Sequence, residues 1–320
     1  MESSQIYQAM TKHRLALFGL AVIWIFFRHT FYYNHILYPF LNPIVQIGDC
    51  GVDIFMFLSG FGLYFSYGKC KSKLEFYRKR VLRILPTVVF LLAIFAIFKD
   101  VVQGKNPTTI IHPRYWIFSV YANYWFIGAI LLFYTLFPFI YACVKKNTKL
   151  FIILSVLLSL VGISCIHFFR VGPFGQLVVY FARFPIFVLG VVFAHHQKLL
   201  SYKKTLVLSC LFSIPLLIFL PKDYQRMMYF PLALFVSVIL PQFFHLAPSV
   251  IIDILSRIGK MSLEFYLIHV FLFGLGIIDY LSSKLCVNAY VSIFLSFIIV
   301  LVCSYLSSVF VSKVIIRGNR

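Results

Sequence analysis

Eight ionisable side chains interrupt long apolar runs of the chain: Arg28, His29, Asp53, His167, Arg183, Glu264, His269 and Asp279. If these runs cross a bilayer, a charge at its centre costs about 2.5–3.5 kcal/mol and should face a cavity or a partner. His29 lies about 22 Å beyond Arg14 along a helix, and Asp53 begins the next apolar run at a similar depth. A histidine and a carboxylate at one depth can form a general base and the group that orients it. The alternative for His29 and Asp53 is a packed polar contact.

A cluster of basic residues precedes the third apolar run. Its members are Lys69, Lys71, Lys73, Arg78, Lys79, Arg80 and Arg83. Arg80 and Arg83 share one helix face because they are three residues apart. Guanidinium groups match phosphate oxygens, so the cluster predicts a cytoplasmic cradle for a phosphorylated compound. A topology anchor or a patch that binds anionic lipid is the alternative.

The composition shows what kind of elements must position these residues. Hydrophobic residues make up 62% of the chain and charged residues 12%, against about 45–50% and 25% in soluble domains. A soluble protein and a disordered chain are therefore excluded. A membrane barrel is disfavoured because its strands alternate polar and apolar residues. We predict an all-α polytopic membrane protein, with one domain over residues 1–320 and ten spans at roughly 14–33, 49–67, 84–103, 119–142, 149–168, 174–195, 203–221, 226–246, 260–282 and 286–312.

The basic residues predict the orientation of these spans. The net charge is +20, and twenty of the 29 lysines and arginines fall in segments on the side of the N-terminus, against seven on the other side. Positive loops stay in the cytoplasm, so both termini are expected there. The membrane orientation therefore explains the net positive charge, and the charge does not indicate a nucleic-acid partner. The seven cysteines are scattered without a CxxC pair, so we expect neither disulfides nor a thiolate metal site.

Several stretches of the chain occur in the order and spacing of a known family. The clearest are FGLAVIWIFFRHT, which ends near His29, GVDIFMFLSGFGLYFS, which contains Asp53, and FYRKRVLRILP, which contains Arg80 and Arg83. Weaker matches are YWFIGAILLFYTLFP, RFPIFVLG and GKMSLEFYLIHVFLF. Together these segments resemble the acyltransferase 3 family of bacterial integral-membrane acyltransferases.

The resemblance implies a ten-helix bundle in the bacterial inner membrane. Such a protein would move an acyl group, usually acetyl, from cytoplasmic acyl-CoA to a hydroxyl of a cell-surface or lipid-linked glycan. His29 would match the catalytic histidine, and Arg80 and Arg83 would match the arginines that hold the CoA phosphates. Asp53 is assigned as the catalytic partner of His29 because of its similar depth in the membrane. We assign Arg14 and Arg78 to the same acetyl-CoA site. The expected partners are acyl-CoA, the glycan acceptor and membrane lipid, with no metal and no nucleic acid.

The chain also departs from the family pattern. Phe18 stands where the family usually has arginine, and Arg14, one turn nearer the cytoplasm, would partly replace it. The glutamate common in the fourth span is absent from GAILLFY. Glu264 and His269 are expected to pack structurally. Two other functions remain open: a transporter or flippase of a glycolipid or anionic solute, and an inactive member of the family.

Overall fold

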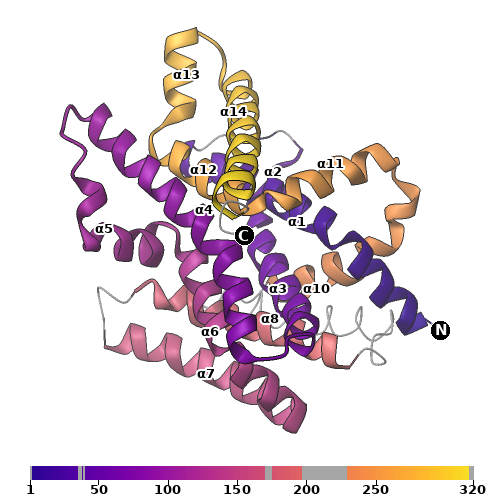
Figure 1. The fold of residues 1–320 in the computed structure, drawn as a ribbon. Coiled ribbons are helices and arrows are strands. Elements are labelled where there is room, and N and C mark those ends of the chain that lie inside the picture. Colours follow the sequence, from indigo (N-terminus) through magenta and orange to yellow (C-terminus); the bar gives the residue numbers. More distant parts are fainter. Residues whose placement is uncertain (1, 35–37, 39, 170–174, 197–228, 317–320) are drawn as a thin grey trace.

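The computed structural model describes residues 2–34, 38, 40–169, 175–196 and 229–316. Every regular element in these ranges is a helix (Figure 1). Seven helical segments of the described chain are long and apolar enough to cross a membrane. The protein is therefore an all-α polytopic membrane protein, as the composition predicts.

The helices follow one another in a simple order. The long ones are α1 (Glu2–Asn34), α3 (Cys50–Gly68), α4 (Lys73–Val102), α6 (Trp125–Lys146), α7 (Thr148–Phe168), α8 (Leu177–His195) and α14 (Ala289–Phe310). The shorter ones are α2 (Asn42–Gln46), η1 (Ile47–Asp49), η2 (Thr109–Ile111), α5 (Pro113–Phe118), η3 (Ser119–Asn123), α10 (Phe230–Val238), η7 (Leu240–Leu246), α11 (Ser249–Lys260), α12 (Ser262–Gly274), α13 (Ile277–Leu285) and η8 (Val311–Ile316).

Two of the predicted spans differ in the structure, and a third is not described. The span expected at 260–282 is a bent pair, because α12 and α13 meet at 61°. Gly276, at the bend, has a φ of 69°, which favours glycine. The span expected at 226–246 is a shorter apolar segment from Phe230 to Leu246, and the one expected at 203–221 lies outside the described residues.

Helix α4 begins well before the span predicted at 84–103. Ser72 caps it by accepting a hydrogen bond from the amide of Glu75 at 3.1 Å, and Glu75 accepts one from the amide of Lys71 at 2.7 Å. This exchange resembles a capping box and fixes the helix start. Pro86 lies inside α4 and does not end it. Arg80 and Arg83 consequently project from a continuous helix.

The centre of the bundle is the parallel pair of α3 and α8. A Cβ added to Gly190 would lie 2.0 Å from the carbonyl oxygen of Phe57, and one added to Gly60 would lie 2.2 Å from that of Phe187. Each glycine thus lets the opposite backbone approach closely, as small residues do between membrane helices. The α8 segment is 72% buried inside the protein, as is the segment that contains α3.

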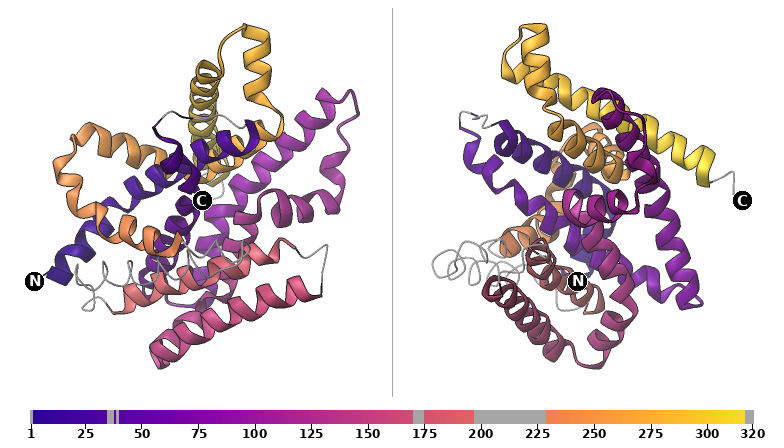
Figure 2. Two further views of the ribbon diagram at one scale, coloured as in Figure 1. Left: turned by 180° about the vertical axis from the view of Figure 1, so that it is seen from behind. Right: turned by 90° about the vertical axis from the view of Figure 1, so that its left-hand side faces the viewer.

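Two helices instead form the outer edges of the bundle. Figures 1 and 2 show α7 at one edge and α14 at the opposite edge, with α1 and α3 between them. Only 22% of each outer segment is buried. The exposed side chains of α7 include Ile153, Leu157 and Val161, which suits contact with lipid tails.

Several predicted cytoplasmic segments meet at one end of the bundle. Tyr64, near the end of α3, hydrogen-bonds His195 at the end of α8 at 2.8 Å. Thr148, at the start of α7, hydrogen-bonds His196 at 2.8 Å. The basic segments that follow α3 and close α6 therefore share this end. The cytoplasmic location of that end remains a prediction.

Candidate active site

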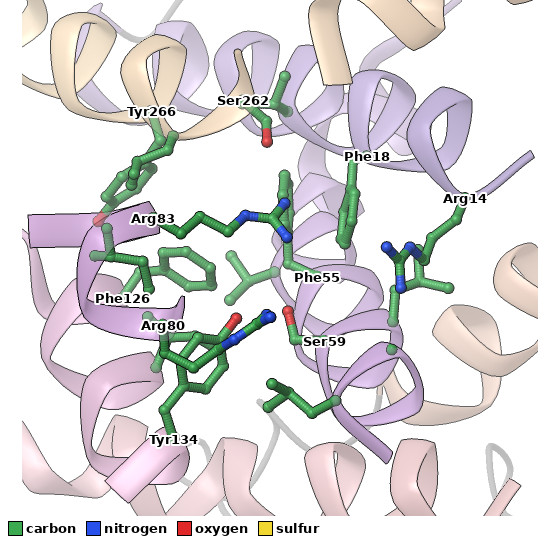
Figure 3. Close-up of a pocket in the computed structure, with 18 of the residues that line it drawn as sticks. Arg14, Phe18, Phe55, Ser59, Arg80, Arg83, Phe126, Tyr134, Ser262 and Tyr266 are labelled. Carbon is green, nitrogen blue, oxygen red and sulfur yellow. The ribbon is translucent and has the colours of Figure 1, made fainter. Parts of the chain in front are cut away.

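A cavity of about 230 Å³ lies between α1, α3, α4, α6 and α12 (Figure 3). Polar groups and aromatic rings line it together. Its walls include Arg14, Phe18, Val22, Ile25, Phe55, Ser59, Gly62, Ser66, Arg80, Arg83, Phe126, Tyr134, Ser262 and Tyr266.

Helix α1 supplies one wall of the cavity from a single face. Arg14, Phe18, Val22 and Ile25 follow one another at steps of three or four residues and all line the cavity. Residues at these spacings stack along a helix. His29 continues the same face one turn beyond Ile25, so the stripe leads from an arginine at one end to a histidine at the other.

Three arginines converge on the cavity from two helices. Figure 3 shows Arg80 and Arg83 reaching from α4 toward α3, with Arg14 approaching from α1. Arg80 donates to Ser66 Oγ at 2.9 Å, while its buried Nε has no partner. Of the hydrogen bonds and ion pairs within the described chain, none involves Arg14 or Arg83. Three guanidinium groups that share one cavity, none of them in an ion pair of the described chain, indicate an anionic ligand.

The structure separates Arg78 from this group. Arg78 is exposed and does not line the cavity. It lies two residues before Arg80, and residues two apart on a helix do not share a face. The sequence cluster thus divides into two residues that enter the cavity and a solvent-facing remainder.

Gly62 makes room for Arg14 on α3. A Cβ at position 62 would lie 2.0 Å from Nη1 of Arg14. The guanidinium therefore rests against the backbone of α3, and a larger residue at position 62 would require the Arg14 side chain to move. This contact brings Arg14 to the same cavity as the arginines of α4.

Aromatic rings form the wall between the arginines and the far end of the cavity. Phe18 stacks on Phe55 with ring centroids 4.9 Å apart, and Phe126 contacts both Phe55 at 5.7 Å and Tyr266 at 5.3 Å. Phe18 is thus part of the wall, while Arg14 carries the positive charge on this face of α1. A wall of aromatic rings suits a ligand whose part inside the cavity is thin and largely uncharged.

His29 is hydrogen-bonded to a second histidine. Its Nδ1 lies 2.9 Å from Nε2 of His269, and Nδ1 of His269 lies 2.8 Å from the carbonyl oxygen of Phe265. The ring of His269 is 5.7 Å from that of Tyr266 in the cavity wall. The histidine pair therefore lies immediately beyond the far end of the cavity.

The predicted pairing of His29 with Asp53 is wrong. Asp53 forms a fully buried ion pair with Arg183 of α8, and its other carboxylate oxygen has no hydrogen-bond partner. The two residues begin their apolar runs at similar depth, but Asp53 faces α8 rather than α1. Arg183, which sequence reasoning left without a partner, neutralises Asp53 in the core.

Two further membrane charges also have partners. Arg28 lies 3.5 Å from Asp49, so it forms an ion pair rather than merely reaching for the membrane surface. Glu264 accepts a hydrogen bond from Thr87 at 3.2 Å, which links α12 to α4.

Sequence reasoning missed several residues of the site. Ser59, Gly62 and Ser66 lie on one face of α3 at spacings of three and four, a signal visible in the sequence. Tyr134 and Tyr266 come from distant segments with no such signal. His269 was expected to serve only in packing, yet it is the partner of His29.

Comparison with known protein families gives a match over most of the chain. A family model described as an acyltransferase domain matches residues 19–316. No curated protein and no solved structure shows significant similarity to the chain.

Proposed function

The matched region spans nearly the whole sequence, so the chain belongs to the acyltransferase 3 family and is a membrane acyltransferase, and we propose that its donor is acyl-CoA. The observation that carries this proposal is the convergence of Arg14, Arg80 and Arg83 on one cavity. No ion pair of the described chain neutralises these three residues. Phosphates of CoA would supply the missing negative charge.

The size of the cavity indicates how CoA would bind. A volume of about 230 Å³ is below the range of about 300–1,000 Å³ typical of small-molecule pockets. The cavity therefore suits the thin pantetheine arm, while the nucleotide stays at the mouth beside Arg83, which is exposed. The arm would pass the rings of Phe18 and Phe55 and carry the thioester toward His29.

We further propose that the acyl group is acetyl and that the acceptor is a hydroxyl of a cell-surface or lipid-linked glycan. This part of the proposal rests on the resemblance described above. The half-buried position of His29, beyond the end of the cavity opposite the arginines, supports it. Donor and acceptor would then reach the reacting atoms from opposite ends of the bundle, in a bacterial inner membrane.

Direct transfer is the simpler scheme, and it needs one base and no covalent relay. Nε2 of His29 takes the proton of the acceptor hydroxyl as the hydroxyl oxygen attacks the thioester carbonyl. The new C–O bond forms as the C–S bond breaks, and the proton passes from the imidazolium to the departing thiolate. A positioned base contributes about 10²–10⁴-fold to such a step.

Radiolabelled acetyl-CoA offered to membranes that contain the protein tests this proposal. Label should appear in the glycan fraction as an alkali-labile ester, and His29→Ala should lower the rate at least about 100-fold while the protein still inserts and binds CoA. Transfer by His29→Ala above about a tenth of the wild-type rate excludes His29 as the base. Label that crosses the membrane without ester formation would favour a transporter.

A further inference from the structure

We propose that His269 is a positioning residue that holds His29 in the tautomer and orientation required for proton abstraction. The inference rests on the proposed function, because it concerns the residue taken as the base. The geometry that carries it is a series of two hydrogen bonds that links the carbonyl oxygen of Phe265, the ring of His269 on α12 and the ring of His29 on α1.

A backbone carbonyl determines which atoms donate and which accept in this series of hydrogen bonds. The oxygen of Phe265 can only accept a hydrogen bond, so Nδ1 of His269, 2.8 Å away, must carry a proton. A neutral His269 then has a lone pair on Nε2, and this atom accepts from Nδ1 of His29 across 2.9 Å. The remaining nitrogen of a neutral His29, Nε2, is the one without a proton. That is the form a general base requires.

Packing fixes the ring of His269. The residue has no exposed surface, and its ring lies 5.7 Å from Phe265, 5.8 Å from Phe273 and 6.1 Å from Phe26. These rings surround His269, so it has little freedom to turn away from His29. The hydrogen bond to Phe265 fixes which nitrogen faces α1.

The charge of the surroundings supports a neutral orienter. Asp53 is paired with Arg183, and Glu264 hydrogen-bonds Thr87. Neither carboxylate forms a hydrogen bond with His269. An imidazole therefore occupies the position that a carboxylate holds in a serine-protease triad. When His29 takes the proton, its Nδ1–H still donates to a lone pair of His269, which stabilises the imidazolium.

Two substitutions at position 269 separate positioning from packing. His269→Leu fills the site but removes the acceptor, and kcat should fall about 10–100-fold, as for loss of other orienting partners. The KM for acetyl-CoA should stay within about twofold, since the arginines are unchanged. His269→Gln supplies an amide oxygen that can accept from His29, and it should recover most of kcat. Phe297→Leu is the matched control: it alters the neighbouring aromatic rings of Phe26 and Phe265 without a ring contact to His269, and it should leave kcat unchanged.

A spectroscopic readout keeps this inference distinct from the proposed function. Nitrogen NMR of histidine-labelled protein should show His29 protonated on Nδ1 in the wild type and redistributed toward Nε2 in His269→Leu. This readout stands even if acetyl-CoA proves not to be the donor, which the transfer assay of the wild type reveals. Wild-type kcat in a folded His269→Leu variant, a His269→Gln variant no better than leucine, or an Nε2-protonated His29 in the wild type would each overturn the inference.

Discussion

The charged residues of the membrane region divide into those that form ion pairs and those that do not. Asp53 and Arg183 neutralise each other within the core, whereas Arg14 and Arg83 line a cavity and form no ion pair with any described residue. Each charge of this buried pair compensates the other, so the pair has a structural role. Unpaired cations around a cavity instead indicate a ligand. The same residue type therefore has different roles in α8 and α4.

Residues within one helix could be predicted from the sequence, and partners on distant helices could not. Arg14 and His29 share a face of α1 by their spacing, as do Arg80 and Arg83 on α4, and the sequence singled out all four. The partner of Asp53 lies 130 residues away and that of His29 lies 240 residues away. Depth in the membrane alone could not decide which way Asp53 faces around its helix.

Neutralising Asp53 should mainly destabilise the protein. Asp53→Asn leaves the charge of Arg183 buried without its counter-ion, which typically lowers stability by about 3–5 kcal/mol. The measurement is thermal unfolding of the detergent-purified variant. The double variant Asp53→Leu with Arg183→Met removes both charges and should recover most of this stability.

The same double variant tests whether Asp53 takes part in catalysis. Since Asp53 does not contact His29, acyl transfer should return together with stability. A double variant that is as stable as the wild type but inactive would contradict the structural role of the ion pair.

The helices position the site through two kinds of contact. Asp53 and Gly60 are seven residues apart on α3, as are Arg183 and Gly190 on α8, so the ion pair and the glycine contact lie two turns apart in one parallel register.

The long apolar helices could be predicted from hydropathy. The bend between α12 and α13 and the early start of α4 could not, because they depend on a left-handed glycine and on a cap rather than on apolar length.

Gly190→Ala should disturb the pairing of α3 with α8. Its Cβ would lie 2.0 Å from the carbonyl oxygen of Phe57, and this backbone atom can move only if the helices separate. Overpacking of this kind typically lowers stability by about 1–3 kcal/mol, which thermal unfolding would detect.

Gly274→Ala is the matched control for the helix contact. A Cβ at position 274 meets nothing within 4 Å, so this variant should be as stable as the wild type or slightly more so. Equal melting temperatures for Gly190→Ala and Gly274→Ala would contradict the close contact between α3 and α8.

At the scale of the whole molecule, charge and packing agree on which segments share an end. The loop after α3 and the last turn of α6 are basic, and hydrogen bonds join the neighbouring helix ends of α3, α7 and α8. The cavity arginines lie toward this end and His29 toward the other. A donor from the cytoplasm and an acceptor from the opposite side would therefore approach the site along one axis.

Reporter fusions test this orientation directly. Fusions after Cys70 and Lys146 should be cytoplasmic, because both follow the basic segments, and a fusion after Asn106 should be external. A fusion after Asp223, outside the described residues, should also be external according to the sequence. An external reporter after Cys70 or Lys146 would overturn the orientation and the cytoplasmic entry of the donor.

The central claim is that the arginine cavity binds the phosphates of CoA. Calorimetric titration of acetyl-CoA into the purified protein tests it most directly, with Arg80→Gln/Arg83→Gln compared with Arg78→Gln. Each charge-assisted contact contributes about 1.5–3 kcal/mol, so losing two should weaken binding at least about 100-fold. Arg78→Gln, which removes a charge outside the cavity, should bind within about twofold of the wild type. Equal affinities for the wild type and Arg80→Gln/Arg83→Gln, or an equal loss in Arg78→Gln, would contradict the claim.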